Sequence, residues 1–329
     1  MNIQKLLSAL LIIVLIAGSF VGCGSGVPAA EDPADDEQFV IVLGDIPEEE
    51  MVPLADSPAI STMLMPVASG TDVRKNDKAT IDASNAADGY VMIKYNSSVS
   101  VGLKVLITGP DKVSYNYNLR KDGAYDTFPF SAGNGAYSIG VYKNISGTQY
   151  STEYTTSVTV TLKDPNAPFL RPNQYVNYNT NTLCVKKAAE LVAGSTTTLD
   201  KVAKVYDYVI KNFTYDKQLA ASVQSGYLPV LDTVWNKKSG ICFDYAAIVT
   251  AMLRSQNIPT KLVIGYTGQA YHAWINVYST ETGWVESVIY FDGKTWKLMD
   301  PTFASSGNAS ESIMKYIGDG KNYSAKYLY

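Results

Sequence analysis

The hydrophobic periodicity of this chain changes once, at a proline-rich segment, and that change limits the folds open to it. From about residue 62 to 163, apolar and polar residues alternate in short runs such as Tyr90–Tyr95 and Thr155–Leu162, with glycine-containing turns between the runs. This pattern predicts short antiparallel strands. After Asp164–Pro168 the apolar spacing becomes helical. We therefore expect an all-β unit followed by a unit in which helices pack on strands.

The all-β unit is placed at residues 56–165 and is expected to be an Ig-like sandwich, because short strands with evenly spaced turn signals are typical of that architecture. It carries no catalytic set of residues. Four of its tyrosines could form a carbohydrate- or peptide-binding face: Tyr115, Tyr117, Tyr125 and Tyr150. Tyrosine also suits a half-buried sheet surface, and we favour that interpretation.

The first 22 residues are expected to be a lipoprotein signal peptide. Lys5 precedes a nearly unbroken apolar run, and small residues lead to Cys23, which would become the lipidated first residue of the mature protein. The run is shorter than the about 20 residues that a membrane-spanning helix needs. An ordinary secretory signal is the alternative. Residues 23–55 are rich in glycine, proline and acid, and are predicted to be a flexible acidic tether. We expect an extracytoplasmic, membrane-anchored protein.

The composition excludes several kinds of site. His272 is the single histidine among 329 residues, so any histidine-dependent chemistry must use it. Three cysteines are too few for a disulfide framework, and they contain no Cys-x-x-Cys pair for zinc. The formal net charge of −4 makes nucleic acid a poor partner. We expect neither a metal nor a cofactor.

Two helices are predicted after the proline-rich segment. The first, over 182–193, places Cys184 on its apolar face, where a free cysteine is usually a small buried hydrophobe. The second begins at Thr197 and Asp200 in a pattern like a capping box. Its apolar stripe is a signal of core packing rather than of chemistry: Val202, Val205, Tyr206, Val209, Ile210 and Phe213.

The residues that carry chemistry lie between 239 and 302. Gly240 allows a tight turn, so Cys242 is expected at the N-terminus of a helix that continues to about residue 256. Unpaired N–H groups and the helix dipole favour a thiolate there. Strands are predicted at 261–266 and 271–278, and a hairpin at 288–299. His272 and Trp274 would project from the same face of the second strand. Asp300 ends the hairpin and has no evident turn role.

Cys242, His272 and Asp300 together are a complete nucleophilic set. The imidazole can take the thiol proton, and the carboxylate can fix the ring tautomer and support the imidazolium. The three are separated by 30 and 28 residues. In papain-type enzymes the histidine lies about 130–150 residues beyond the cysteine, so the spacing argues against that family.

At this point the sequence resembles the transglutaminase-like superfamily, specifically its bacterial secreted members. The resemblance covers roughly residues 206–303 and rests on these matches: Gly240-x-Cys242-x-Asp244-Tyr245-Ala246, Ile258-Pro259, Gly265-Tyr266, His272-x-Trp274 and Trp296-x-x-x-Asp300-Pro301-Thr302. It implies an α+β fold with a papain-like transglutaminase core at residues 166–329. It also implies that Cys242 is the nucleophile, His272 the general base and acid, and Asp300 the orienting carboxylate.

The resemblance further implies that Trp274 shields the Cys–His pair from water. An oxyanion hole would need the backbone N–H of Cys242 and one further donor, and the sequence does not choose between Tyr215 and Trp235. The expected function is a surface-anchored thiol enzyme that acts on peptide or glutamine-type amide bonds, by hydrolysis or by acyl transfer to an amine. The expected partner is a protein or peptide substrate at the cell envelope. The alternative is a catalytically silent adhesion or scaffolding lipoprotein.

Overall fold

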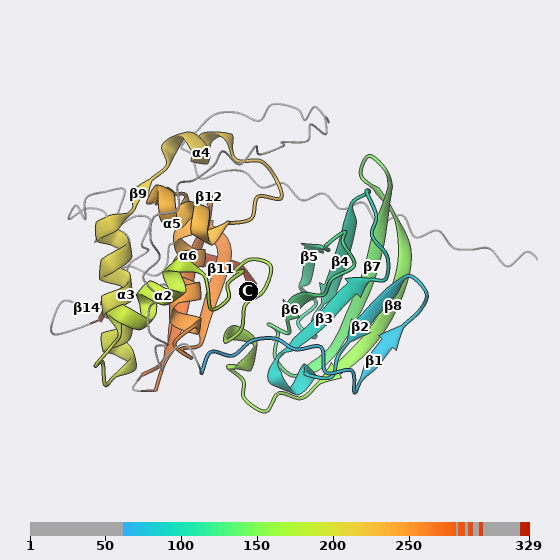
Figure 1. Ribbon diagram of the computed structural model, residues 1–329, viewed down its shortest axis with the longest axis horizontal. Helices are drawn as coiled ribbons and strands as arrows, with labels where there is room; N and C mark the ends of the chain where they lie inside the picture. Colours follow the sequence, from blue (N-terminus) through green and yellow to red (C-terminus); the bar gives the residue numbers. More distant parts are fainter. Residues whose placement is uncertain (1–61, 281, 287–288, 292–295, 299–322) are drawn as a thin grey trace, which may run out of the picture.

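The computed structural model describes residues 62–280, 282–286, 289–291, 296–298 and 323–329. It has an all-β part followed along the chain by a part in which helices pack on an antiparallel sheet (Figure 1). Cys23, the expected signal peptide, the acidic tether and Asp300 lie outside the described residues. In the described part, no helix is both long and apolar enough to cross a membrane.

The all-β part consists of two four-stranded antiparallel sheets. The first is β1 (Val73–Lys75), β2 (Ala79–Asp82), β3 (Tyr90–Tyr95) and β6 (Asp126–Pro129). The second, in spatial order, is β5 (Ser114–Asn118), β4 (Leu103–Thr108), β7 (Gly135–Ser146) and β8 (Gln149–Val160). Short 3-10 turns lie at Ala86–Asp88 and Ala167–Phe169.

Alternation along the strands builds the core between these sheets. In β4, Leu103, Val105 and Ile107 are buried while the residues between them are half-buried. Tyr117 of one sheet meets Phe128 of the other edge-to-face, with ring centroids 4.8 Å apart. The predicted strands at 90–95 and 155–162 are confirmed in position, although β8 begins six residues earlier, at Gln149, and ends at Val160. The assignment of an Ig-like topology stays a prediction.

The second part is built around one buried helix. Its helices are α2 (Leu183–Leu191), α3 (Thr198–Asn212), α4 (Lys217–Ser222), α5 (Leu231–Lys237) and α6 (Cys242–Arg254). Its four-stranded sheet has the order β13 (Gly283–Val285), β12 (Ala270–Ser279), β11 (Thr260–Thr267) and β16 (Tyr323–Leu328). Two short pairs complete it: β9 (Thr214–Tyr215) with β10 (Ser239–Gly240), and β14 (Ile289–Phe291) with β15 (Trp296–Leu298).

Helix α6 is buried along its whole length, with α2, α3 and α5 around it and with β11 and β12 against it. Local signals place the neighbouring elements as the sequence predicts. The hydroxyl of Thr197 accepts a hydrogen bond from the N–H of Asp200 at 3.1 Å and caps α3. After α6 ends, Asn257 adopts a left-handed conformation with φ of 58° and Pro259 leads directly into β11. The expected α+β core is therefore confirmed.

Tyrosines join the two parts of the molecule. Tyr175 and Tyr329 stack with ring centroids 3.8 Å apart, and both contact Tyr117 of β5. Tyr115 packs edge-to-face on Tyr329, and its hydroxyl accepts a hydrogen bond from the N–H of Leu328. Tyr115 and Tyr117 are thus packing residues, as we favoured, while Tyr150 lines a cleft described below.

Candidate active site

Cys242 is the first residue of α6, and the residue before it is extended. The residue is 6% exposed, so Cys242 is buried rather than on open surface. The N–H groups of the first helical turn have no partner within the helix. Cys242 therefore lies where backbone dipoles favour negative charge, as the sequence predicts.

Asp244 fixes the start of this helix. Its Oδ2 accepts a hydrogen bond from the N–H of Ile241 at 2.8 Å, and its Oδ1 accepts one from the hydroxyl of Tyr227 at 2.6 Å. Burial raises the pKa of Asp244, and the two donors oppose that rise. The sequence placed Asp244 only within the matched motif that begins at Gly240. It did not reveal Tyr227, because a loop residue 17 positions earlier carries no periodic signal.

Gly240 makes this arrangement possible. A Cβ atom at position 240 would lie 2.6 Å from Cβ and 2.8 Å from Oδ2 of Asp244, which is closer than real side chains approach. The glycine therefore lets the carboxylate fold back over the chain to reach the N–H of Ile241. The turn before Cys242 and the cap of α6 therefore depend on the same close contact between Gly240 and Asp244.

His272 and Trp274 lie in β12, two residues apart and therefore on one face of the strand. Both are buried, and their rings are nearly parallel, inclined by 23° with centroids 6.5 Å apart. Opposite His272 in β11 is Gly265, where a Cβ would lie 2.8 Å from the Trp274 ring and 2.1 Å from the carbonyl oxygen of Ser324. Three elements are thus packed closely around the indole.

The packing of α6 against β12 brings the element that begins with Cys242 onto the strand that carries His272 (Figure 1). The third expected member of the set, Asp300, is outside the described residues. Cys184, a residue of α2, differs from Cys242 because it is fully buried, and this burial raises the pKa of its thiol. Among the described residues, no group of three or more His, Cys, Asp or Glu side chains could hold a metal ion.

The two candidates for a second oxyanion donor have different surroundings. Tyr215 in β9 pairs with Gly240 in β10, two residues before Cys242. Trp235 is buried in α5, where its ring stacks on Tyr208 with centroids 5.6 Å apart and lies 3.3 Å from the ammonium group of Lys238. Tyr215 is thus beside the turn that leads to the candidate nucleophile, and Trp235 belongs to an aromatic–cation cluster.

Residues 185–301 match the model of the Transglutaminase-like superfamily. This part of the chain is a transglutaminase-like domain. The matched segment contains Cys242, His272 and Asp300, and it begins within α2, so it includes every helix from α3 to α6.

Several known proteins are similar to this chain. The uncharacterized protein YebA of Bacillus subtilis (strain 168) is 30% identical over 105 residues, which are 26% of this chain and 14% of YebA. A candidate cysteine protease from Cytophaga hutchinsonii has 15% identity and a TM-score of 0.33, over 70% of this chain and 78% of that one. Red sea bream transglutaminase has 14% identity and a TM-score of 0.25, over 65% of this chain and 48% of that one.

Proposed function

We propose that this protein is a thiol enzyme that attacks an amide carbonyl with the sulfur of Cys242. One observation carries the proposal: α6 begins at Cys242 and packs on the strand that holds the chain's single histidine. This arrangement lies within a transglutaminase-like domain. Burial of both side chains excludes bulk water, which strengthens their electrostatic interaction.

The reaction would proceed through a thioester. His272 takes the proton of Cys242, and the thiolate adds to the amide carbon, so that a C–S bond forms and the carbonyl oxygen becomes negative. The N–H of Cys242 and the second donor hold that oxygen. The C–N bond then breaks, and His272 returns its proton to the leaving amine. Asp300 would orient the imidazole, and Trp274 would keep water from the ion pair.

The acyl group leaves the enzyme when water or a second amine attacks the thioester. We favour attack by water, that is, hydrolysis. Mass spectrometry of envelope peptides, incubated with the enzyme with and without a primary amine, distinguishes the two outcomes. Hydrolysis gives shortened or deamidated peptides in both samples. An isopeptide product would instead establish acyl transfer.

Alkylation by iodoacetamide tests the nucleophile itself. Cys242 should react well below pH 8.5, the approximate pKa of an ordinary thiol, and the reaction should slow in the His272→Ala variant. Cys184 is the internal control, because its buried thiol should remain unlabelled in the folded protein. Peptide mapping assigns the label to each cysteine. Equal, slow labelling of both would contradict the proposal and favour the alternative, a silent adhesion or scaffolding protein.

We further propose that the enzyme acts in an extracytoplasmic space at a membrane surface, held there by lipid on Cys23. The support is the pattern of a charged residue, an apolar run and small residues before that cysteine. Two or more acyl chains would anchor the protein durably. Metabolic labelling with a fatty acid should mark the wild-type protein and not the Cys23→Ala variant. Labelling of both would refute the lipid anchor.

A further inference from the structure

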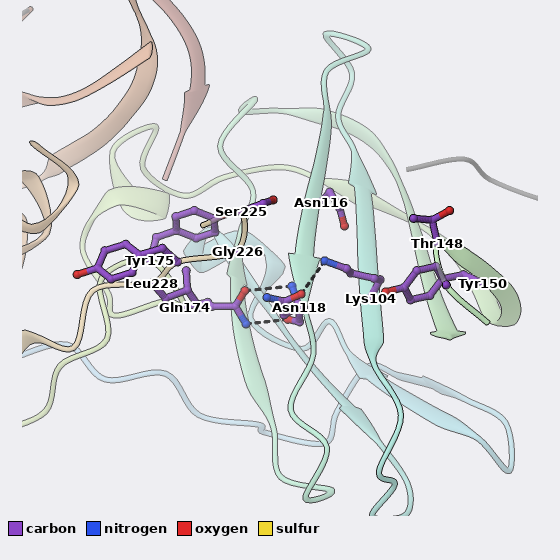
Figure 2. A pocket seen from close by; sticks show the side chains of 12 residues that line it. Lys104, Asn116, Asn118, Thr148, Tyr150, Gln174, Tyr175, Ser225, Gly226 and Leu228 are labelled. Carbon is purple, nitrogen blue, oxygen red and sulfur yellow. Dashed lines mark hydrogen bonds between the residues drawn. The ribbon is translucent and has the colours of Figure 1, made fainter. Parts of the chain in front are cut away.

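A polar cleft lies between the all-β part and the transglutaminase-like domain, next to the start of α6. Its volume is about 200 Å³. One wall comes from the second sheet, with Lys104, Asn116 and Asn118, and the opposite wall is the loop Ser225–Leu228 (Figure 2). Gln174 and Tyr175 also line the cleft.

The cleft is coupled to the candidate active site through two of its lining tyrosines. The ring of Phe243, the residue after Cys242, contacts Tyr175 at 5.6 Å and Tyr227 at 6.3 Å between centroids. Tyr227 also donates its hydroxyl proton to the carboxylate of Asp244. A molecule in the cleft would therefore lie against side chains that contact the first turn of α6.

One wall of the cleft is an open sheet edge. Strand β5 is at the edge of its sheet, and within the described ranges β4 is its only strand partner. The N–H of Leu119 bonds to the carbonyl of Leu103, and Asn116 lies opposite Leu106 in the same register. In an antiparallel ladder, hydrogen-bonded residue pairs alternate with pairs that are not hydrogen-bonded to each other. Leu119 belongs to a hydrogen-bonded pair, so the N–H and C=O groups of Asn118 and Asn116 point away from β4.

The side chain of Gln174 already occupies part of that edge in the manner of a neighbouring strand. Its amide nitrogen Nε2 donates to the backbone carbonyl of Asn118 at 2.7 Å, and its Oε1 accepts from the backbone N–H of Asn118 at 3.1 Å (Figure 2). The next backbone N–H and C=O that point away from β4 belong to Asn116. None of the hydrogen bonds among the described residues uses these two groups. The side-chain Oδ1 of Asn116 is likewise screened from solvent and has no hydrogen-bond partner in the part of the chain that the structure describes.

The cleft also holds a cation with no acidic partner among the described residues. Lys104 donates to Oδ1 of Asn118 at 2.7 Å and takes part in none of the ion pairs of the described part. Burial lowers the pKa of its ammonium group, which a carboxylate from a ligand would offset. The cleft therefore offers a positive charge, unused backbone groups at a sheet edge, and aromatic rings.

We propose that this cleft binds an extended, carboxylate-bearing segment of the peptide substrate, which adds to β5 at Asn116 and places its carboxylate on Lys104. Peptides add to open sheet edges through main-chain hydrogen bonds, and pockets beside the edge select side chains. This inference rests on the proposed function for the substrate, but the binding itself needs no turnover.

The test measures binding to the full-length Cys242→Ala protein, so that it is independent of catalysis. The probes are fluorescein-labelled libraries of short peptides with Glu, Gln or N-methylated Glu fixed at one position, and the readout is fluorescence anisotropy. The Glu library should bind about tenfold more tightly than the Gln library, because a charge-assisted bond is lost. N-methylation, which removes a main-chain donor and adds bulk, should weaken binding similarly.

Two variants locate the site. Lys104→Met should abolish the preference for Glu, whereas Lys94→Met, which removes a strand lysine from the other sheet, should retain it. Peptide binding should also slow amide hydrogen exchange at Asn116 but leave Asn118, already paired with Gln174, unchanged. Equal binding of the three libraries, or a preference that survives Lys104→Met, would overturn the proposal. Tighter binding by a synthetic peptide of residues 31–50 would overturn the substrate as occupant in favour of the chain's own acidic segment.

Discussion

At the scale of single residues, the positions of Cys242, His272 and Trp274 could be predicted because each depends on a local pattern. A glycine before an apolar helix places the cysteine at its first turn, and strand alternation places the two rings on one face. The contacts of Asp244 could not be predicted in this way. They depend on Tyr227, which reaches the helix from a loop between α4 and α5.

The second oxyanion donor can be decided by comparing conservative variants of its two candidates. We expect Tyr215→Phe to lower kcat by about 10²-fold or more, because a hydrogen-bond donor to the oxyanion is lost. Trp235→Phe should change kcat by less than tenfold and should instead lower stability, since the indole is packed on Tyr208 and Lys238. Steady-state turnover of the same peptide pool and urea denaturation give the two readouts. A larger loss of kcat in Trp235→Phe would assign the donor role to Trp235 instead.

At the scale of elements, segments with a clear periodicity or a turn signal could be predicted, and strands with neither could not. The sequence placed α3, α6, β11 and β12 within about two residues. It did not single out β1, β2 or β16, because these strands form where a partner strand is available and their sequences carry no clear alternation. Strand β16 pairs with β11, more than fifty residues earlier in the chain.

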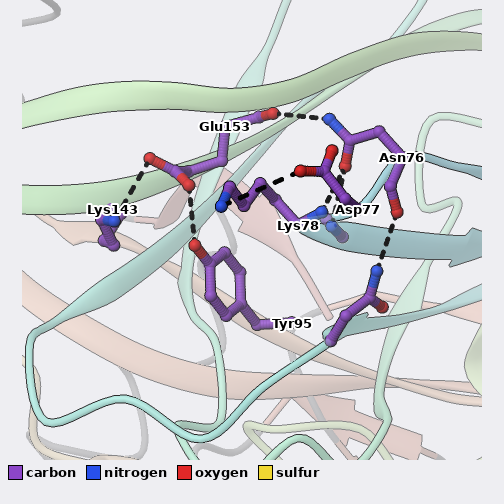
Figure 3. A network of polar contacts seen from close by, with 8 residues as sticks. Asn76, Asp77, Lys78, Tyr95, Lys143 and Glu153 are labelled. Carbon is purple, nitrogen blue, oxygen red and sulfur yellow. Dashed lines mark hydrogen bonds and ion pairs between the residues drawn. The ribbon is translucent and has the colours of Figure 1, made fainter.

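Polar contacts between the two sheets of the all-β part show the same dependence on distant partners. The carboxylate of Glu153 in β8 accepts a hydrogen bond from the hydroxyl of Tyr95 in β3 at 2.7 Å, and Lys143 lies 3.8 Å from its other oxygen (Figure 3). The backbone carbonyl of Glu153 accepts from the side chain of Asn76 at 2.9 Å. These contacts connect the two sheets, and no local sequence pattern predicts them.

The start of α6 should tolerate no side chain at position 240. We expect Gly240→Ala to lower the free energy of unfolding by about 1–3 kcal/mol, since its methyl group would displace the Asp244 carboxylate. Activity should fall by more than the loss of folded protein explains, because Cys242 moves with the first turn. Urea denaturation and turnover per folded molecule provide the measurements.

Gly102→Ala is the matched control for this substitution. A Cβ there would lie 3.4 Å from the nearest atom, the hydroxyl oxygen of Tyr150, which is an ordinary contact. This variant should keep both wild-type stability and wild-type activity. If Gly240→Ala behaved in the same way, the capping arrangement around Asp244 would not be what positions Cys242.

At the scale of the whole molecule, the two parts share an aromatic cluster that the sequence could not reveal, because its members are far apart along the chain. Tyr115 and Tyr117 come from β5, Tyr175 from the segment between the two parts, and Tyr329 follows β16. Arg254, fully buried at the end of α6, donates to the carbonyl oxygens of both Arg171 and Tyr329. The two parts should therefore unfold together, although each has its own sheet structure.

This coupling can be tested because the four tryptophans all lie in the second part: Trp235, Trp274, Trp284 and Trp296. Tryptophan fluorescence thus follows the second part, and pulsed hydrogen exchange of β4 and β7 amides follows the first. In urea the two transitions should coincide for the wild type. Tyr329→Ala should cost about 3 kcal/mol or more and separate the transitions, because it removes the ring that stacks on Tyr175 and meets Tyr117.

A control substitution distinguishes loss of coupling from simple loss of stability. Tyr137→Ala removes a buried ring that packs on Phe130 inside the first part, 4.6 Å away between centroids. It should lower the denaturation midpoint while the two transitions still coincide, since the cluster around Tyr329 stays intact. Separate transitions in the wild type would mean that the tyrosine cluster does not couple the parts. The contact between the two parts, which forms the cleft, would then be less stable than the sheet within either part.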